Sequence, residues 1–268
     1  MKYLENAIKF ITRHYILAVP LLISTAIAAL LGGSTTGFTG RLWEILAEMK
    51  PQISSLRNPS AIMSLVTTAA VISGAGFISL VLTLIVTPAT YGMVNKALNE
   101  GFATLNDFVP QFKNNIAKYL IFWLGNLVIW IVFSIICVLL IVITSLISAI
   151  IKWLGLLLFI IVFITMFIAA VYISVNITLW FPAMAIDNLD VVSAFKKSFS
   201  LVKKHFWMIL GICVLVTILS SLANLILSIP GMIPLLGPIL LSVVPSASTF
   251  IMIVFYLMYY KDETMNLV

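Results

Sequence analysis

Charged side chains are scarce in this sequence, and their scarcity excludes an ordinary soluble domain. Asp, Glu, Lys and Arg make up 9% of the 268 residues, whereas hydrophobic residues make up 62% and the mean hydropathy is +1.19. A typical soluble domain is about half apolar and about a quarter charged. A soluble core cannot bury this excess, because many side chains of any domain must face water. Lipid can solvate it, so the composition predicts an integral membrane protein.

Motifs for catalysis and metal binding are also missing. There is no His-Glu-x-x-His, no Walker glycine loop with Lys, and no Gly-x-Ser-x-Gly elbow. The two cysteines, Cys137 and Cys213, lie inside apolar runs and are expected to pack there, since a metal site needs more ligands. General acid–base catalysis needs a positioned titratable group, and none occupies the middle of an apolar run. We therefore expect no enzyme activity, no metal and no other cofactor.

Long apolar runs are what the sequence has in abundance. A bilayer core of about 30 Å needs roughly 20 helical residues, and unbroken runs exclude the short alternating strands of a membrane barrel. We predict an all-α polytopic membrane helix bundle that forms one domain over residues 1–268. Lys152 marks a very tight turn between the third and fourth transmembrane helices. The six predicted transmembrane helices cover residues 15–33, 62–94, 119–151, 153–182, 206–228 and 239–260.

The first apolar run has two interpretations. Ala26-Ile27-Ala28 resembles the cleavage site of a signal peptide. However, the run from Tyr15 to Gly33 is longer than the roughly 7–15 apolar residues of a signal peptide. We therefore expect a retained helix.

The distribution of Lys and Arg predicts the orientation of the helices. One set of connecting segments holds 11 of these residues, and the alternate set holds 4. The larger set is Lys2, Lys9, Arg13, Lys96, Lys113, Lys118, Lys196, Lys197, Lys203, Lys204 and Lys261, and the smaller is Arg41, Lys50, Arg57 and Lys152. The positive-inside rule places both termini in the cytoplasm and the 34–60 loop, with a short surface helix at Leu42–Met49, outside. These loops explain the net charge of +6, so no nucleic-acid partner is expected.

A weak threefold repeat divides the chain into units of about 1–94, 104–186 and 187–262. Each unit begins with a short amphipathic segment and continues with two apolar runs, a common way to build membrane bundles. The first run is entered similarly in two units, at Ile11-Thr12-Arg13-His14-Tyr15 and Val202-Lys203-Lys204-His205-Phe206. The second run of each unit carries a proline beside a small residue, at Pro88-Ala89, Pro182-Ala183 and Pro245-Ser246. In the middle unit, Thr104 and Asp107 indicate the start of a helix.

The amphipathic segments are expected to lie on the cytoplasmic face of the membrane, with apolar sides toward acyl chains and basic sides toward anionic headgroups. The alternative is that they are ordinary juxtamembrane linkers that help to set the topology. In the third segment, the apolar side consists of Val191, Val192, Phe195, Phe199, Val202 and Phe206. The candidate headgroup ligands are Lys9, Arg13, Lys113, Lys118, Lys196, Lys197, Lys203 and Lys204.

Residues that are polar or break helices inside the apolar runs have a functional and a structural interpretation. Asn126, Asn176 and Asn224 either converge on a polar site or, as we favour, form interhelical hydrogen bonds. Pro20, Pro88, Pro182 and Pro245 either open backbone carbonyls to a substrate or, as we favour, bend their helices. The proline-rich stretch 229–238 is expected to form an outer turn. The expected anchors at the membrane interface are His14, His205, Trp123, Trp153, Trp180 and Trp207.

One set of residues carries a family resemblance: Pro182, Ala194, Ser198, Leu201, Lys204, Trp207 and Gly211. Their order resembles a motif of a broad prokaryotic superfamily, the YciC-like proteins and the membrane domain of glycerophosphoryl diester phosphodiesterases. Pro88 with Gly92, and Pro245 followed by Tyr256, Tyr259 and Tyr260, are similar to that family's second and sixth helices. The resemblance implies a six-helix bundle with cytoplasmic amphipathic connectors in the inner membrane of a prokaryote. It does not imply catalysis, because the chemistry of the fused phosphodiesterases lies in a separate soluble barrel.

Two main hypotheses for the function follow. The first is a non-enzymatic membrane protein that interacts with lipids or organises a membrane complex, with a membrane-protein partner or as a homo-oligomer. The second is a transporter or permease-like protein for a small or amphiphilic solute. Ionisable residues in the middle of the spans would favour the second hypothesis, and they are missing. A membrane enzyme is the least favoured hypothesis.

Overall fold

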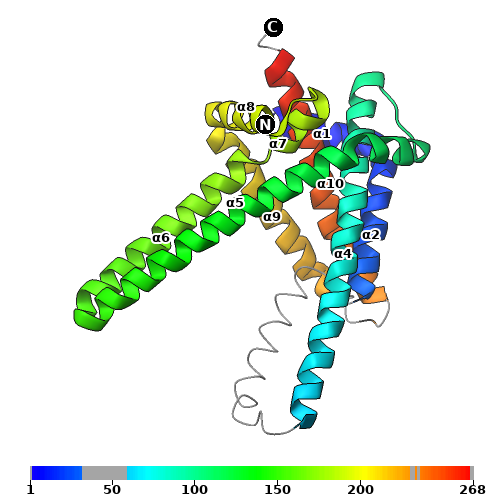
Figure 1. The fold of residues 1–268 in the computed structure, drawn as a ribbon. Helices are drawn as coiled ribbons and strands as arrows, with labels where there is room; N and C mark the ends of the chain where they lie inside the picture. The colour runs from blue at the N-terminus through cyan, green and yellow to red at the C-terminus, as the bar shows by residue number, and fades with distance from the viewer. Residues whose placement is uncertain (1, 32–58, 230–232, 234–235, 266–268) are drawn as a thin grey trace. The chain divides into compact units, whose positions relative to one another are not determined.

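The computed structural model describes residues 2–31, 59–229, 233 and 236–265, and these residues form helices joined by short connections, with no strand among them (Figure 1). This confirms the all-α class. The helices are α1 (Lys2–Arg13), η1 (Tyr15–Ala18), α2 (Val19–Leu30), α4 (Pro59–Glu100), η2 (Leu105–Asp107), α5 (Phe108–Ile150), α6 (Lys152–Asn176), α7 (Trp180–Ile186), α8 (Val191–Lys204), α9 (Phe206–Ser228) and α10 (Leu236–Met265).

Several of these helices are long and apolar enough to cross a membrane. Five described stretches meet that condition, namely Gly76–Glu100, Leu105–Ile150, Lys152–Ile186, Phe206–Ser228 and Leu236–Thr264. A sixth exists if the bent pair of Glu5–Arg13 and Tyr15–Leu30, which meet at 90°, counts as one crossing. A helix satisfies its backbone hydrogen bonds internally, which is why apolar runs of this length form helices in lipid.

The chain divides into two compact units. The first unit consists of Met1–Ile116 and Val214–Phe255, and the second of Ala117–Cys213 and Tyr256–Val268. In the first unit, α2 packs along α4, and Thr25 of α2 donates a hydrogen bond to the carbonyl of Ser242 in α10 at 3.3 Å. Met93 of α4 and Phe255 of α10 are fully buried there.

Aromatic rings form the centre of the second unit. Phe122 of α5 meets the Trp180 ring of α7 edge-on at 5.4 Å, and Trp180 meets Phe195 of α8 at 4.9 Å. Tyr119 meets Phe181 edge-on at 5.0 Å. Such edge-to-face pairs stabilise packing beyond the area that they bury. The same unit contains most of the long α5–α6 hairpin, which Figure 1 shows as two helices side by side.

The predicted boundaries agree with the structure in some places. α9 has the predicted limits, and Ile151 alone separates α5 from α6, which confirms the tight turn at Lys152. Thr104 and Asp107 form a capping box at the start of η2, as predicted. The predicted surface helix at Leu42–Met49 lies outside the described residues, as does half of the predicted 229–238 turn. Residues 236–238 of that turn belong to α10.

The predicted fourth transmembrane helix, 153–182, falls within one stretch long and apolar enough to cross a membrane, Lys152–Ile186, but the helix breaks inside this stretch. α6 ends at Asn176 and α7 begins at Trp180. The Ser198 hydroxyl donates to the Asn176 carbonyl at 2.5 Å, and the Thr178 hydroxyl donates to the Val175 carbonyl at 2.7 Å. These hydroxyls satisfy carbonyls that a helix end leaves without intrahelical partners.

The four prolines fall into two classes. Pro88 lies inside α4 and Pro245 inside α10. Pro20 lies at the start of α2, and Pro182 lies in the first turn of α7. Proline is tolerated in a first turn because the backbone N–H there has no intrahelical acceptor. Pro20 and Pro182 therefore lie in the first turns of their helices, whereas Pro88 and Pro245 lie in helix interiors, and the predicted bends stay predictions.

Two of the three amphipathic segments are separate helices, α1 and α8. The middle segment is not, because η2 leads directly into α5, which runs unbroken to Ile150. The breaks after α1 and α8 are alike: His14 has φ −122° and ψ 30°, and His205 has φ −131° and ψ 36°. This local similarity fits the predicted repeat, which stays a prediction.

Candidate functional site

The first unit contains an apolar groove of about 390 Å³ between α2, α4 and the start of α5. Its size falls in the range of small-molecule pockets. Ser24 is the one hydroxyl in its lining, and its Oγ donates to the Leu21 carbonyl at 2.9 Å. The groove therefore suits an apolar group. Its lining residues are Val19, Pro20, Ile23, Ser24, Ile27, Leu82, Val86, Leu105, Phe108 and Val109.

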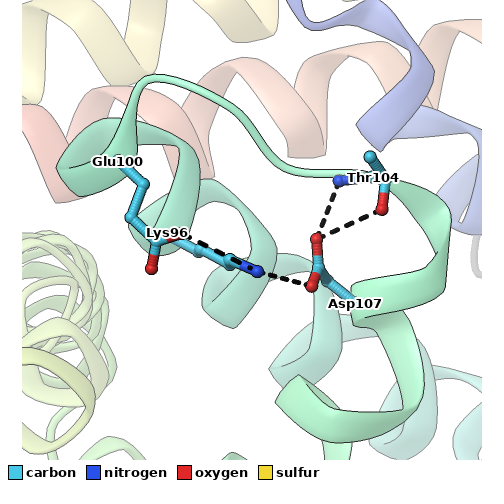
Figure 2. A network of polar contacts seen from close by, with 4 residues as sticks. All are labelled: Lys96, Glu100, Thr104 and Asp107. Carbon is cyan, nitrogen blue, oxygen red and sulfur yellow. Dashed lines mark hydrogen bonds and ion pairs between the residues drawn. The ribbon is translucent and has the colours of Figure 1, made fainter.

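The start of α5 forms the third wall of this groove, after α2 and α4. A polar cluster joins the end of α4 to η2, which leads into this wall (Figure 2). The cluster, which we call the clasp, consists of Lys96, Glu100, Thr104 and Asp107. The Lys96 Nζ lies 2.6 Å from Oδ1 of Asp107 and 3.8 Å from Oε2 of Glu100. Oδ2 of Asp107 accepts a hydrogen bond from the Thr104 backbone N–H at 2.9 Å. The Asp107 carboxylate thus pairs with Lys96 near the end of α4 and caps the start of η2.

The chain reaches the clasp through a glycine at the end of α4. Gly101 has a φ of +82°, and its N–H donates to the Ala97 carbonyl at 3.0 Å. A residue with a side chain rarely adopts this left-handed conformation, which commonly ends helices. Because Gly101 reverses the chain, Leu105, Phe108 and Val109 can reach the groove.

α5 lies very close to α4 near the groove. A Cβ atom at Gly92 would lie 2.6 Å from both the Asn115 Nδ2 and the Gln111 Oε1. It would also lie 2.7 Å from the Cβ of Gln111, so glycine at position 92 allows the two helices to approach this closely. Asn115 is 5% exposed, and its Nδ2 donates to the Gln111 carbonyl at 2.9 Å.

In the second unit, Asp187 connects three helices. It follows α7, and its Oδ2 accepts from Lys197 Nζ of α8 and from Tyr260 Oη of α10, both at 2.5 Å. The Lys197 ammonium also lies 5.4 Å from the centroid of the Tyr260 ring. A cation over an aromatic ring adds to the ion pair. Lys197 is therefore a structural residue of this unit.

Helix α8 has one side in the protein core. Its N-cap is Asp190, whose Oδ2 accepts from the N–H groups of Val192 and Ser193. The buried side of α8 consists of Ala194, Ser198, Leu201 and Val202, all between 0% and 2% exposed. Phe195 and Phe199 are half-buried, and Phe195 packs on Trp180. Of the predicted apolar side, Val202 is therefore buried in the protein, whereas Val192 is 58% exposed. Contact of the exposed part of this side with acyl chains stays a prediction.

The eight candidate headgroup ligands fall into two groups: three have a side-chain partner among the described residues, and five make no ion pair there. Lys9 pairs with Glu5 at 2.7 Å, Lys118 donates to Asn188 Oδ1 at 2.5 Å, and Lys197 pairs with Asp187. The other five are exposed and make no ion pair within the described ranges: Arg13, Lys113, Lys196, Lys203 and Lys204. These five are the residues free to meet an external anion.

The asparagines do not form the expected interhelical bonds in the part of the chain that is described. Asn176 is fully buried, and its Nδ2 donates to the Tyr172 carbonyl of the same helix at 2.8 Å. The Oδ1 atoms of Asn126 and Asn176 are buried and have no hydrogen-bond partner among the described residues. Both residues belong to the second unit, whereas Asn224, half-buried in α9, belongs to the first.

The expected interfacial anchors have different environments. Trp153 and Trp207 are 86% and 80% exposed, so both are accessible, and their position in an aromatic belt stays a prediction. Trp180 is buried, and its indole N–H donates to the Val191 carbonyl at 2.9 Å, so it is a core residue. The His14 ring lies 4.5 Å from the Phe10 ring, and His205 Nδ1 lies 3.0 Å from Tyr259 Oη.

Sequence reasoning missed the groove, the role of Lys96 and the role of Asp187. The signal for Asp187 was available, because it is a carboxylate directly after an apolar run in a region otherwise rich in lysine. Asp107 was recognised as a helix start, but its ion pair with Lys96 joins residues on two helices. The groove had no signal of its own, since its lining is ordinary apolar sequence.

Comparison with known protein families gives a match over nearly the whole sequence. Residues 4–260 match a family described as "Domain of unknown function (DUF7847)". No curated protein and no solved structure matches. Because the match covers nearly the whole sequence, the chain belongs to the DUF7847 family.

Proposed function

We propose that this chain is a non-enzymatic multi-pass protein of a prokaryotic cytoplasmic membrane that binds anionic lipid headgroups. The observation that supports this most is the division of α8 into two sides. One side is buried in the protein, and the other presents Lys196, Lys203 and Lys204, which are exposed and make no ion pair within the described ranges.

The position of α8 in the sequence supports headgroup contact. Lys204 ends α8, and α9, which is apolar enough to cross a membrane, begins at Phe206. Trp207, 80% exposed, lies in the first turn of α9. A basic helix immediately before a membrane span, with an exposed Trp at the junction, is placed at headgroup depth. The excess of Lys and Arg in the same set of connecting segments favours a cytoplasmic location for this face.

The resemblance to the YciC-like superfamily remains part of this proposal. Its motif residues Ala194, Ser198 and Leu201 share the buried side of α8. The motif would therefore serve to pack the helix rather than to bind a substrate. Titratable groups elsewhere, such as Asp187 and Asp107, are engaged in ion pairs, which fits a protein without catalytic chemistry.

The test is lipid retention by the purified protein in native mass spectrometry. Replacing Lys196, Lys203 and Lys204 with Gln should weaken retention of phosphatidylglycerol but not of phosphatidylcholine. Each basic residue near anionic lipid contributes roughly 1 kcal/mol, so the triple variant should lose up to about 100-fold at low salt. The matched control replaces the same residues with Arg and should keep wild-type retention. Equal retention by the Gln and wild-type proteins would refute the proposal.

A permease-like protein for an amphiphilic solute is the second candidate, and the apolar groove is the observation that favours it. Its lining has no ionisable side chain, so a charged solute would have no counter-ion there. Uptake of a fluorescent amphiphile into proteoliposomes tests this candidate, with empty liposomes as the control.

A further inference from the structure

We propose that the groove of the first unit holds one acyl chain of an anionic phospholipid, whose headgroup lies against Lys113. This inference rests on the proposed interaction with anionic lipid, but it uses a different unit of the chain and different residues. Three kinds of observation carry it: the three stretches of chain that line the groove, the apolar character of this lining, and the lysine beside it.

Three stretches of the chain line the groove. Residues Val19, Ile23 and Ile27 repeat at helical spacing, so they form a continuous stripe along α2. The stripe is roughly 12 Å long, at 1.5 Å per residue. Leu82 and Val86 of α4 form the second wall, and the start of α5 forms the third. An acyl chain here would contact all three of these stretches rather than a single helix.

The lining matches an acyl chain rather than a solute that hydrogen-bonds. The Ser24 hydroxyl already donates to the Leu21 carbonyl of its own helix. Ile23 is 53% exposed and Val109 is 55% exposed, so the groove is open along its length and a long flexible chain can enter from the side. The side chains there present apolar surface to the occupant.

The charge next to the groove favours an anionic headgroup. The carboxylate of Asp107 is already paired with Lys96 in the clasp. Lys113 lies four residues after Val109 in α5, which places it one turn farther along the same helix face. Lys113 is exposed and makes no ion pair with any described carboxylate. Lys96 is shared by the carboxylates of Asp107 and Glu100, at 2.6 Å and 3.8 Å. Lys113, one turn from the groove lining, is therefore the cation that remains for an anionic headgroup.

The direction of the groove agrees with this placement under the proposed topology. Val19 lies at the start of α2, and α2 would enter the membrane from the cytoplasmic face. Leu105, Phe108 and Lys113 lie at the start of the Leu105–Ile150 crossing, which follows that of α4 and would therefore begin on the same face as α2. A headgroup at Lys113 and a chain that extends past Val19 toward Ile27 would then match the orientation of a lipid in the cytoplasmic leaflet.

The test fills the groove and measures retained lipid by native mass spectrometry. Ile23→Trp should weaken retention of phosphatidylglycerol about tenfold, because the indole occupies the space of several methylene groups. The matched control is Ile218→Trp, since Ile218 of α9 is also 53% exposed and does not line the groove. This control should retain the lipid as the wild-type protein does. Equal retention by the two variants would overturn the proposal.

A second pair of variants covers the case in which Ile23→Trp does not fold. Val109→Phe enlarges the α5 wall, and Val128→Phe enlarges a residue of the same helix with similar exposure, 57% against 55%. Only the first should weaken retention.

Lys113→Gln should remove the preference for phosphatidylglycerol over phosphatidylcholine while one lipid is still retained. Retention of oleate together with no retention of phosphatidylglycerol would identify a fatty-acid site and overturn the proposal.

The outcome is distinguishable from that of the α8 experiment. If Ile23→Trp behaves like Ile218→Trp while the α8 lysine variant loses lipid, the groove proposal fails and the proposed function stands. If the α8 variant is unaffected and Ile23→Trp loses one phosphatidylglycerol, headgroup binding by α8 fails and the groove is the lipid site.

Discussion

Lys96 and Asp107 are joined at 2.6 Å across the turn between α4 and η2, and the same carboxylate caps the helix that follows. The connection between α4 and η2 contains Gly101, which has a left-handed conformation and nothing within 4 Å of its Cβ position. The clasp restrains this connection. The side chains of Lys96 and Asp107 are 24% and 18% exposed, so solvent screens this pair less than a surface pair. The clasp is thus the feature that gives the groove a fixed third wall.

Replacing Asp107 separates the two roles of its carboxylate. Asp107→Asn keeps an oxygen for the Thr104 N–H but loses the ion pair, whereas Asp107→Ala loses both. We expect the melting temperature in detergent to fall by a few degrees for Asn and further for Ala. Glu5→Gln is the control, because the Glu5–Lys9 pair is exposed and such pairs contribute little. A melting temperature of Asp107→Ala equal to that of the control would contradict the role of the clasp.

The N-cap of α8 predicts a pH dependence. Hydrogen bonds from the Ser193 hydroxyl, then from the Ser193 N–H, lower the pKa of Asp190 below its ordinary value, and the Val192 N–H adds to this. Because the pKa is lower in the folded state, the stabilisation is complete above the unfolded pKa of about 4 and is lost as the pH falls through the folded pKa.

The variant Asp190→Asn tests this pH dependence. Asn is also a good N-cap, but it does not titrate. Melting temperatures measured from about pH 7 to about pH 3 should converge for the two proteins as the acid limit is approached. A difference between wild-type protein and variant that stays constant across this range would contradict the prediction.

Close packing in the second unit makes Gly125 sensitive to substitution. A Cβ atom there would lie 2.6 Å from Cη2 of the buried Trp180. We expect Gly125→Ala to destabilise the protein by about 1–3 kcal/mol, the usual cost of overpacking. Gly211→Ala is the control, because nothing lies within 4 Å of a Cβ at Gly211 and Ala favours a helix. Thermal unfolding in detergent measures both, and equal melting temperatures would rule out the contact with Trp180.

The hydroxyl of Tyr260 should also be important for stability. Tyr260→Phe removes a hydrogen bond to the Asp187 carboxylate, and such bonds to charged groups contribute about 1.5–3 kcal/mol. Tyr172→Phe is the matched control, since Tyr172 is 47% exposed. If the melting temperature of Tyr260→Phe is no lower than that of Tyr172→Phe, the hydrogen bond from Tyr260 to Asp187 does not stabilise the protein.

The sequence predicted those features that depend on local chemistry. The limits of α9 follow from an uninterrupted apolar run, and the helix start at Thr104 follows from side chains three residues apart. The turn at Lys152 follows from one charge between two apolar runs. Each of these signals is contained within a short stretch of sequence, so no knowledge of the packing is needed.

Features that depend on tertiary contacts were not predicted. The break after Asn176 is stabilised by Ser198, which lies in another helix. Trp180 has the sequence context of an interfacial Trp, but α5 and α8 bury it. Lys196 and Lys197 are adjacent and chemically identical, yet one is exposed and the other pairs with Asp187. The direction of a side chain relative to its partners decides such cases, and a sequence does not give it.

The topology can be tested by labelling single cysteines in intact cells. In a variant with Cys137 and Cys213 replaced by Ala, Ser200→Cys should resist an impermeant maleimide, because the exposed face of α8 is expected in the cytoplasm. Lys152→Cys, at the α5–α6 turn, should react from outside, as should Ser55→Cys in the segment outside the described residues. Permeabilised cells control for accessibility, since Ser200→Cys should react there. The opposite pattern would place the α8 lysines on the outer face and remove the basis for their contact with anionic lipid of the cytoplasmic leaflet.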